Sequence, residues 1–321
     1  MKRVLQQQHT HRSKPDERSL GTVVSNTSFG TNEEVYDRLV GLGLIDSHPC
    51  CRGCNTPFTS HRPRSSLHFS FQCWKCGAKN NLLDGTELKG VKKIGLFFAV
   101  AINWVSNGKT TTLLGETGID PKTLADYRKR LRNVMVKTFE RMTKEEMMLG
   151  GDGVIVEVDE CKLFSPKYHR GHPPTSKDVW VVGVIERDAT NGRRSAFLLT
   201  NTRGADVLVP FIKEWVKEGS VLMSDCWRGY TDELDGYVLH ERFNHSEEFA
   251  HVVVINGNEV SANTNHIERE WLEVRRVLMC KGPERYEEEL AMEMFRLRFL
   301  AGKPVNEQAY VLMKKMAALK K

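Results

Sequence analysis

The chain has 321 residues, a length that predicts about two domains. Hydrophobic residues make up 40% of it and charged residues 27%, as in ordinary globular proteins. No apolar stretch reaches the roughly 18 residues of a membrane-spanning helix, and the N-terminus lacks the apolar segment of a secretory signal. We therefore expect neither a membrane protein nor an exported one.

The net charge of +6 is unevenly distributed along the chain. Residues 1–150 carry a net charge of +9, whereas residues 151–321 carry −3. This asymmetry favours a first half that binds a polyanion and a second half whose function requires acids. The basic residues within residues 1–32 predict a flexible basic arm at the start of the chain. A plain disordered tail is the alternative.

Two paired cysteine motifs follow, with 18 residues between them. They comprise Cys51, Cys54, Cys73 and Cys76. This spacing is typical of a structural zinc site, because four thiolates in tetrahedral geometry suit Zn²⁺. We therefore predict a zinc ribbon with a preceding helix over residues 33–85. Two alternatives stay open: a disulfide framework, and Cys50 in place of Cys51 as a ligand.

Residues 86–149 are predicted to be helical, and part of this segment has the pattern of a helix-turn-helix. A first helix ends near Gly118, Asp120 caps the second, and Pro121 lies in its first turn. The basic face of the second helix comprises Lys122, Arg128, Lys129, Arg130 and Arg132. Such a face is typical of a helix that enters a DNA groove, although a solvated charged surface gives the same pattern.

After residue 150 the pattern changes to that of an α/β domain. Apolar runs separated by turns predict strands over 154–158, 178–187, 193–200 and 220–227. Segments with one apolar face predict helices over 205–217 and 263–278. A helical tail that serves packing or assembly is expected over 281–321.

Three acids of this domain are remote in sequence but are predicted to meet in space. Asp159 follows the first strand, and Asp225 stands at the end of the fourth. Glu268 lies beside the apolar face of the last helix, from which it can point towards the edge of the sheet. Grouped carboxylates repel one another unless cations bind, and Mg²⁺ or Mn²⁺ prefers carboxylate oxygens. Two such ions are typical of in-line phosphoryl transfer, whereas solvated acids at strand ends are the simpler alternative.

Several motifs of this domain resemble one known family. They read, in chain order, IVEVDECK, KYHRGH, WVVGVIER, SDCWRGY, FNHSEEF and NTNHIEREW. Over about residues 150–280 the chain resembles the Merlin superfamily of DNA transposases, eukaryotic relatives of bacterial ISXO-type insertion-sequence transposases. The resemblance implies an RNase H-like catalytic domain with a mixed sheet. By motif it also implies a DDE triad of Asp159, Asp225 and Glu268, which would bind two Mg²⁺ or Mn²⁺ ions.

Two positions before the third acid depart from the family pattern. Asn263 stands where a histidine is usual, and His266 stands where a threonine is usual. Near the triad, the residues expected to contact DNA are Lys162, His169, Arg170 and His245. A solvated basic loop and a structural histidine are the corresponding alternatives.

The resemblance implies a cut-and-paste DNA transposase. The zinc ribbon and the helical segment are expected to bind terminal inverted repeats, and the RNase H-like domain is expected to cleave DNA and transfer the strand. Because two element ends are handled together, we expect a homo-oligomer. The alternative is a domesticated, transposase-derived DNA-binding protein without transposition activity. The expected location is the nucleus, or the cytoplasm in a bacterial host.

Overall fold

A computed structural model describes residues 32–58, 69–163, 179–187, 192–225, 230, 232–234, 239–243, 251–255, 257–279 and 282–320. They belong to two compact units. The N-terminal unit contains the residues up to Arg130 together with 316–320, and the sheet unit contains residues 131–315. The finer division of the chain into five segments stays a prediction. Apart from Asn32, the expected basic arm lies outside the described residues.

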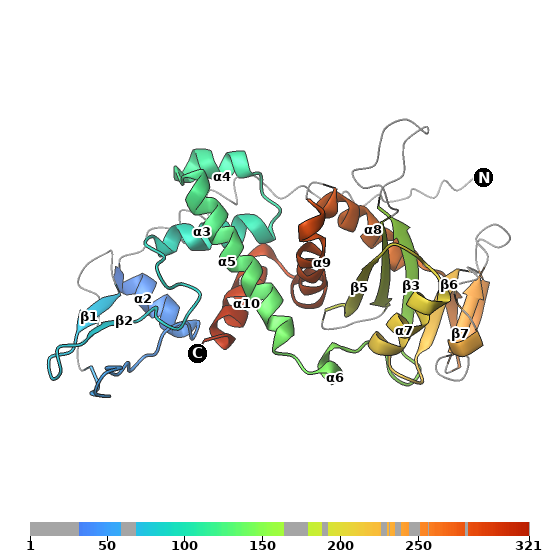
Figure 1. Cartoon of the computed structure of the whole chain (residues 1–321), viewed down its shortest axis with the longest axis horizontal. Helices are drawn as coiled ribbons and strands as arrows, with labels where there is room; N and C mark the ends of the chain where they lie inside the picture. Colours follow the sequence, from blue (N-terminus) through green and yellow to red (C-terminus); the bar gives the residue numbers. More distant parts are fainter. Residues whose placement is uncertain are drawn as a thin grey trace, which may run out of the picture. The chain divides into compact units, whose positions relative to one another are not determined.

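The N-terminal unit consists of short strands and longer helices (Figure 1). Its elements are α2 (Asn32–Gly41), β1 (Ser70–Gln72), β2 (Lys79–Asn81), α3 (Ile94–Val105), α4 (Thr110–Thr117) and the first half of α5 (Pro121–Glu140). Strands β1 and β2 pair antiparallel. Helix α3 is apolar on nearly all sides, and nine of its twelve residues are buried. It therefore forms the centre of this unit and not a membrane span.

The turn between α4 and α5 confirms the predicted helix-turn-helix pattern. Gly118 ends α4 in the left-handed conformation, with φ of 60°. The Asp120 side chain accepts a hydrogen bond from the Thr123 amide at 2.9 Å, which caps the start of α5. Leu124 and Tyr127 are each 4% exposed, so the apolar face of α5 is buried as expected.

The sheet unit begins with the second half of α5 and contains most of the regular structure. Its strands are β3 (Ile155–Lys162), β4 (Trp180–Glu186), β5 (Ser195–Thr200), β6 (Val221–Asp225), β7 (Leu239–Phe243), β8 (His251–Ile255) and β9 (Asn258–Ala262). Its further helices are α6 (Lys144–Met147), α7 (Ala205–Trp215), α8 (Asn265–Leu278), α9 (Tyr286–Phe295) and, up to Lys315, α10 (Val305–Ala318). No helix in the described part of the chain combines the length and apolar character needed to cross a bilayer.

Five strands form one mixed sheet in the order β5-β4-β3-β6-β7. Strands β5, β4 and β3 are antiparallel neighbours, whereas β6 and β7 run parallel to β3. This mixed sheet, with helices packed on it, confirms the predicted α/β class and is consistent with an RNase H-like fold.

The two faces of the sheet are covered by different helices. Because side chains alternate along a strand, Val156 and Val158 of β3 pack into the core beneath α7. Cys161 points the other way, into a core that contains Ile267 and Trp271 of α8. The residues of β3 with odd numbers therefore face α8, the helix that carries Glu268.

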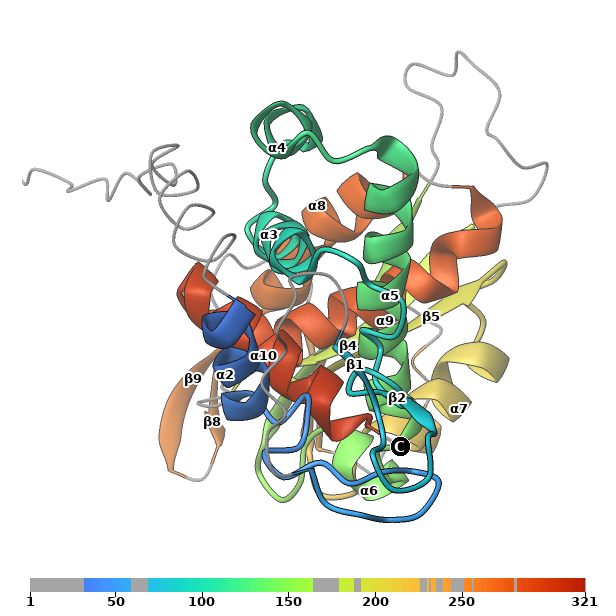
Figure 2. The ribbon, with the colours of Figure 1, turned by 90° about the vertical axis from the view of Figure 1, so that its left-hand side faces the viewer.

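A second, two-stranded sheet is formed by β8 and β9, which the sequence reading did not predict (Figure 2). Inward-facing side chains of this hairpin, including Val253 and Ile255, pack on Val221 and Met223 of β6. The hairpin therefore extends the cover over the α8 side of the sheet. The Asn-Gly pair at 256–257 is a hairpin signal, and Gly257 adopts the required positive φ of 79°.

Candidate functional site

The two predicted aspartates lie side by side on the central strands. Strands β3 and β6 pair in parallel register up to Glu157 and Met223. Two residues further in the same register come Asp159 and Asp225, so both point to the α8 face. The sequence reading placed Asp159 at the end of its strand, which is wrong. Strand β3 continues to Lys162 because β4 pairs with it over that length.

Asp159 is held by a residue of α8. Its Oδ2 atom accepts a hydrogen bond of 2.7 Å from the indole Nε1–H of Trp271. The residue opposite Asp159 on β4 is Gly183. A Cβ atom at that position would lie 2.7 Å from the Trp271 ring and 2.9 Å from Ile267. Glycine therefore allows α8 to pack against the sheet beside Asp159.

The three predicted acids interact electrostatically. Burial raises the pKa of Asp159 to about 6; the Trp271 hydrogen bond opposes this shift, while the negative charges of Asp225 and Glu268 add to it. Asp159 and Asp225 are half-buried and Glu268 is exposed, so the group borders solvent. A cation would relieve the repulsion, and an all-carboxylate donor set fits hard Mg²⁺ or Mn²⁺.

Glu268 lies in the first turn of α8, and its position depends on Thr264. The Thr264 hydroxyl donates a hydrogen bond of 2.7 Å to Oε1 of Glu268. The three carboxylates do not gather as tightly as ligands of one ion, since among the described residues only a cysteine group has its ligand atoms within 4.8 Å of one another. Wider spacing is expected if two ions about 4 Å apart share the acids.

Glu157, two residues before Asp159, has a different function. It is fully buried, and its Oε2 atom accepts hydrogen bonds from the amides of His266 and Ile267, at 2.9 and 3.1 Å. Its Oε1 atom accepts one from Arg187 Nε at 2.7 Å. Glu157 thus caps the N-terminus of α8 from the sheet. The sequence alone does not predict this role, because it depends on the packing of α8 against β3.

The two departures from the family pattern belong to the same network. The His266 ring nitrogen Nδ1 lies 2.7 Å from Oε1 of Glu157. Arg187 also donates hydrogen bonds to the backbone carbonyls of Ser261 and Asn263, at 2.6 and 2.5 Å. The altered residues therefore participate in fixing the start of α8.

Glu160 points to the opposite face of the sheet, where the buried Tyr230 hydroxyl donates a hydrogen bond to it. Burial raises the pKa of Glu160 to about 7; Tyr230 opposes this, and the charges of Asp159 and Asp225 add to it. The acids that the sequence crowds around β3 therefore separate into three environments, and only Asp159 shares a face and register with Asp225.

Positive charge lies next to the acids at the same end of the sheet. Lys162 Nζ and the Arg203 guanidinium lie 5.7 and 4.6 Å from the centre of the Trp180 ring. Lys162 was predicted to contact DNA, whereas Trp180 and Arg203 were not. The other predicted contacts here, His169, Arg170 and His245, lie outside the described residues.

The basic face of α5 is largely occupied by contacts within the protein. Arg128 donates a hydrogen bond to Thr110 Oγ1 at 2.9 Å. Arg130 donates to the carbonyls of Glu87 and Lys89 at 2.9 and 2.8 Å, and Arg132 pairs with Glu288 at 3.4 Å. Of the five predicted residues, Lys122 and Lys129 are the exposed ones.

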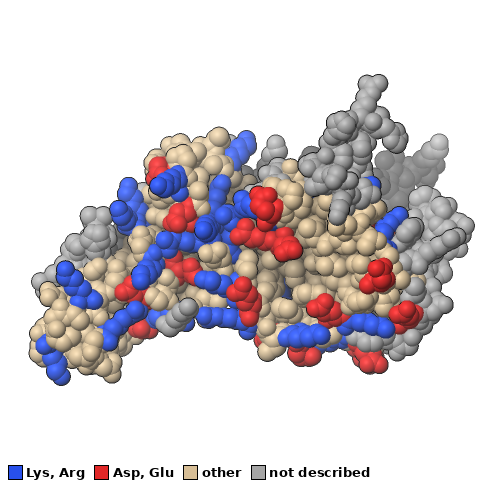
Figure 3. Space-filling view, in the orientation of Figure 1, with Lys and Arg blue, Asp and Glu red and all other residues tan. Residues whose placement is uncertain are grey.

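Positive side chains nevertheless gather on the N-terminal unit. On the face shown in Figure 3, Lys and Arg are denser over the helices α3 to α5 than over the sheet unit. A cavity of about 380 Å³ lies between the loop before α3 and the start of α5. Its charged lining residues are Lys92, Lys93, Lys122, Asp120 and Asp126.

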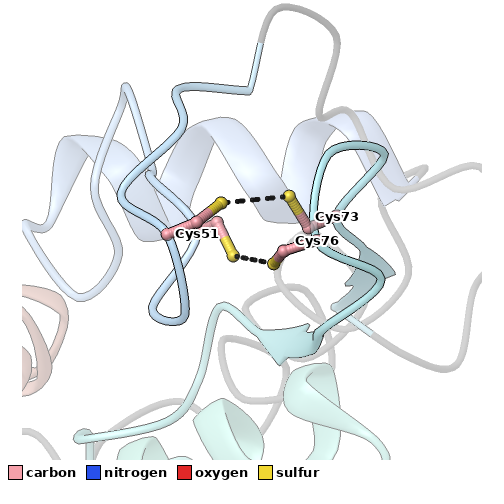
Figure 4. A group of neighbouring side chains, drawn as sticks. Cys51, Cys73 and Cys76 are labelled. Atoms are coloured by element: carbon pink, nitrogen blue, oxygen red, sulfur yellow. Dashed lines mark hydrogen bonds between the residues drawn. The ribbon is translucent and has the colours of Figure 1, made fainter.

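The four predicted zinc ligands come together in the N-terminal unit. The sulfur atoms of Cys51, Cys54, Cys73 and Cys76 all lie within 4.8 Å of one another (Figure 4). Two sulfur pairs are 3.5 and 3.6 Å apart, far longer than the roughly 2.05 Å of a disulfide bond. Tetrahedral Zn²⁺ with bonds of about 2.3 Å requires sulfur separations of roughly 3.8 Å. The group therefore fits zinc and excludes the disulfide alternative.

The structure also shows which of Cys50 and Cys51 belongs to the group of candidate zinc ligands. Cys51 belongs to the sulfur group, whereas Cys50 is exposed and lies outside it. Burial opposes ionisation of the Cys51 thiol, but hydrogen bonds from the backbone of Cys54 and Gly53 and from Asn80 lower its pKa to about 6. A thiol that loses its proton readily is a ready metal ligand.

One comparison with known proteins bears on the sheet unit. Residues 149–280 match the family model of the ISXO2-like transposase domain, a segment that includes Asp159, Asp225 and Glu268. A comparison with curated proteins found no match. The narrower assignment to the Merlin superfamily stays a prediction. The matched segment runs from just before β3 to just after α8 and so contains the five-stranded sheet.

Proposed function

We propose that the chain is a cut-and-paste DNA transposase whose sheet unit cleaves DNA at the ends of a mobile element and transfers the freed strand to a target. One observation carries this proposal. Asp159 and Asp225 lie on neighbouring strands, each two residues beyond the last paired residues Glu157 and Met223, and both Asp225 and Glu268 interact electrostatically with Asp159, in a domain that matches a transposase family model.

The three carboxylates are assigned as the ligands of two Mg²⁺ or Mn²⁺ ions. Bound ions would activate water or a 3′-hydroxyl and stabilise the leaving oxygen of an in-line displacement. We assign Asp159 as the ligand shared by both ions, because it lies on the strand next to that of Asp225 and interacts electrostatically with both other acids. Its Oδ2 atom is oriented by Trp271, and Thr264 orients Glu268. The protein's contribution is positioning and charge neutralisation, so no covalent intermediate on the enzyme is needed.

DNA contacts are assigned to both units. Near the acids, Lys162 and Arg203 are placed to neutralise phosphates of the cleaved strand. In the N-terminal unit, the zinc-bound cysteine group and the helix-turn-helix are assigned to binding terminal inverted repeats, with Lys122 and Lys129 facing solvent. Because both element ends take part in the reaction, the active form is proposed to be a homo-oligomer. The proposed location is the nucleus.

A cleavage assay tests this function. The full-length, zinc-loaded protein is incubated with Mg²⁺ and DNA from the ends of its element, and strand cleavage and joining are followed on a sequencing gel. Asp225→Asn removes one metal-binding charge but keeps the shape, so we expect cleavage to fall about 10³-fold, equivalent to about 4 kcal/mol. DNA binding should persist.

Asp152→Asn is the matched control, because Asp152 is exposed in the turn before β3 and lies at the other end of the sheet. It should cleave at the wild-type rate. Binding without cleavage by the wild-type protein would instead identify a domesticated DNA-binding protein. Cleavage by Asp225→Asn at the wild-type rate would reject the proposed site.

A further inference from the structure

Helix α8 begins in an unusual way. Thr264 occupies the N-cap position, where a threonine hydroxyl commonly accepts a hydrogen bond from an amide of the first turn. Here the Thr264 side chain caps no amide. Its hydroxyl instead donates to Oε1 of Glu268, one turn further along the helix, at 2.7 Å. Thr264 is therefore at the N-cap position of α8, but its hydroxyl binds Glu268 and not a backbone amide.

The helix is capped nevertheless, by an acid from the sheet. Oε2 of Glu157 accepts hydrogen bonds from the backbone amides of His266 and Ile267, which are the second and third residues of α8. Glu157 in turn is paired with Arg187, and both side chains are less than 9% exposed. Because this carboxylate satisfies the free amides, the Thr264 hydroxyl is released from capping.

The hydrogen bond from Thr264 restricts the rotamers of the Glu268 side chain. Glu268 is exposed, and an exposed glutamate samples many rotamers that binding a metal must restrict. Thr264 is only 1% exposed, so its hydroxyl is a fixed point of the core. The bond engages Oε1 of Glu268, one of the two oxygens through which a carboxylate can bind a metal ion.

We propose that Thr264 is a positioning residue that orients Glu268 for a divalent cation, and that Glu157 makes this possible by capping α8 in its place. The inference rests on the proposed function, since it concerns the same metal site. It assigns to the threonine of the NTNHIE segment a task that is separate from helix capping.

The test compares Thr264→Val, which keeps the shape of the side chain but removes the hydroxyl, with Thr264→Ser, which keeps the hydroxyl. Mn²⁺ binding to the full-length, zinc-loaded protein is measured by calorimetry and by the loss of the free Mn²⁺ electron paramagnetic resonance signal. We expect Mn²⁺ affinity to fall 10- to 100-fold in Thr264→Val, the usual effect of losing a group that orients a metal ligand. Thr264→Ser should bind within about threefold of wild type, since the donor is retained.

Cleavage kinetics supply a second readout. In Thr264→Val the Mg²⁺ concentration for half-maximal cleavage should rise by the same factor, and the rate at saturating Mg²⁺ should recover. A variant with a merely disturbed fold would not be rescued by Mg²⁺.

Each result has a distinct meaning. If Thr264→Val binds Mn²⁺ as tightly as the wild type, or if Thr264→Ser loses as much affinity as Thr264→Val, the positioning role is wrong. If the wild-type protein binds Mn²⁺ no better than Asp159→Asn, the metal site itself is absent and the proposed function fails before the threonine is considered.

Discussion

The chain contains two candidate metal sites that are built in opposite ways. The cysteine site takes its four ligands from two short motifs within residues 51–76, and their sulfur atoms already lie within 4.8 Å of one another. The carboxylate site takes its ligands from three elements, β3, β6 and α8, across more than 100 residues. Its acids repel one another and border solvent.

This difference is the one expected between a structural metal site and a catalytic one. A closed group of soft thiolates satisfies zinc completely and leaves no position for a substrate. An open group of hard carboxylates keeps room for water and for phosphate oxygens. The first site depends on local turns, whereas the second depends on the tertiary contacts that place α8 on the sheet.

Removing a zinc ligand should have the largest effect, because zinc binding to such sites contributes on the order of 10 kcal/mol that is coupled to folding. Cys73→Ser is expected to lose zinc, measured by elemental analysis, and to lose the ordered structure of residues 32–58 and 69–93, measured by limited proteolysis. The sheet unit should stay folded. Cys50→Ser is the control and should retain one zinc ion per chain, since Cys50 lies outside the sulfur group. Retention of zinc by Cys73→Ser would show that the sulfur group is not the site.

Removing Arg187 should damage the carboxylate site and leave the zinc site intact. Arg187→Leu removes the arginine that is paired with the fully buried Glu157 and leaves this charge only the His266 ring and two backbone amides, so we expect a loss of about 3 kcal/mol in the free energy of unfolding. Urea denaturation followed by tryptophan fluorescence measures this loss. Arg276→Leu is the control, because Arg276 and Glu273 form an exposed pair on α8 worth less than about 1 kcal/mol. Equal losses in the two variants would contradict a structural role for the Glu157–Arg187 pair.

A smaller effect should appear on changing the pH. Burial and neighbouring negative charges raise the pKa of Asp159 from 3.8 to about 6 in the metal-free protein. The folded chain therefore binds this proton more tightly than the unfolded chain, and its stability falls as the pH rises from about 3.8 to about 6. Metal binding requires the ionised carboxylate, so Mn²⁺ affinity should drop about tenfold per pH unit below pH 6.

Calorimetric titration with Mn²⁺ between pH 5 and pH 8 measures this dependence. The zinc content of the protein should stay constant between pH 6 and pH 8. Asp225→Asn removes one of the charges that raise the pKa of Asp159, so it should move the midpoint to lower pH. An affinity that does not change between pH 5 and pH 7 would show that Asp159 is not a ligand.

Features that depend on local pattern could be predicted from the sequence. The cysteine spacing predicted the group of four sulfur atoms, and Gly118, Asp120 and Pro121 predicted the turn between α4 and α5. The register of β3 and β6 could not be predicted, because an apolar run indicates a buried strand but not which residues of the neighbouring strand lie opposite it. The contacts of Glu157 and Thr264 could not be predicted either. Glu157 contacts a different element, α8, and the Thr264 hydroxyl donates to Glu268 where a helix cap would be expected.

Gly183 affects how related sequences should be compared, because the presence of the three acids does not by itself show that they are arranged as in this chain. It faces Asp159 across the sheet, and the absence of its side chain sets how close α8 can approach. A methyl group at this position would overlap the ends of the Trp271 and Ile267 side chains, so these residues of α8, the helix that carries the third acid, would have to shift. A chain can therefore keep Asp159, Asp225 and Glu268 and still hold them in a different arrangement, so a comparison of related sequences is more informative when it includes this glycine.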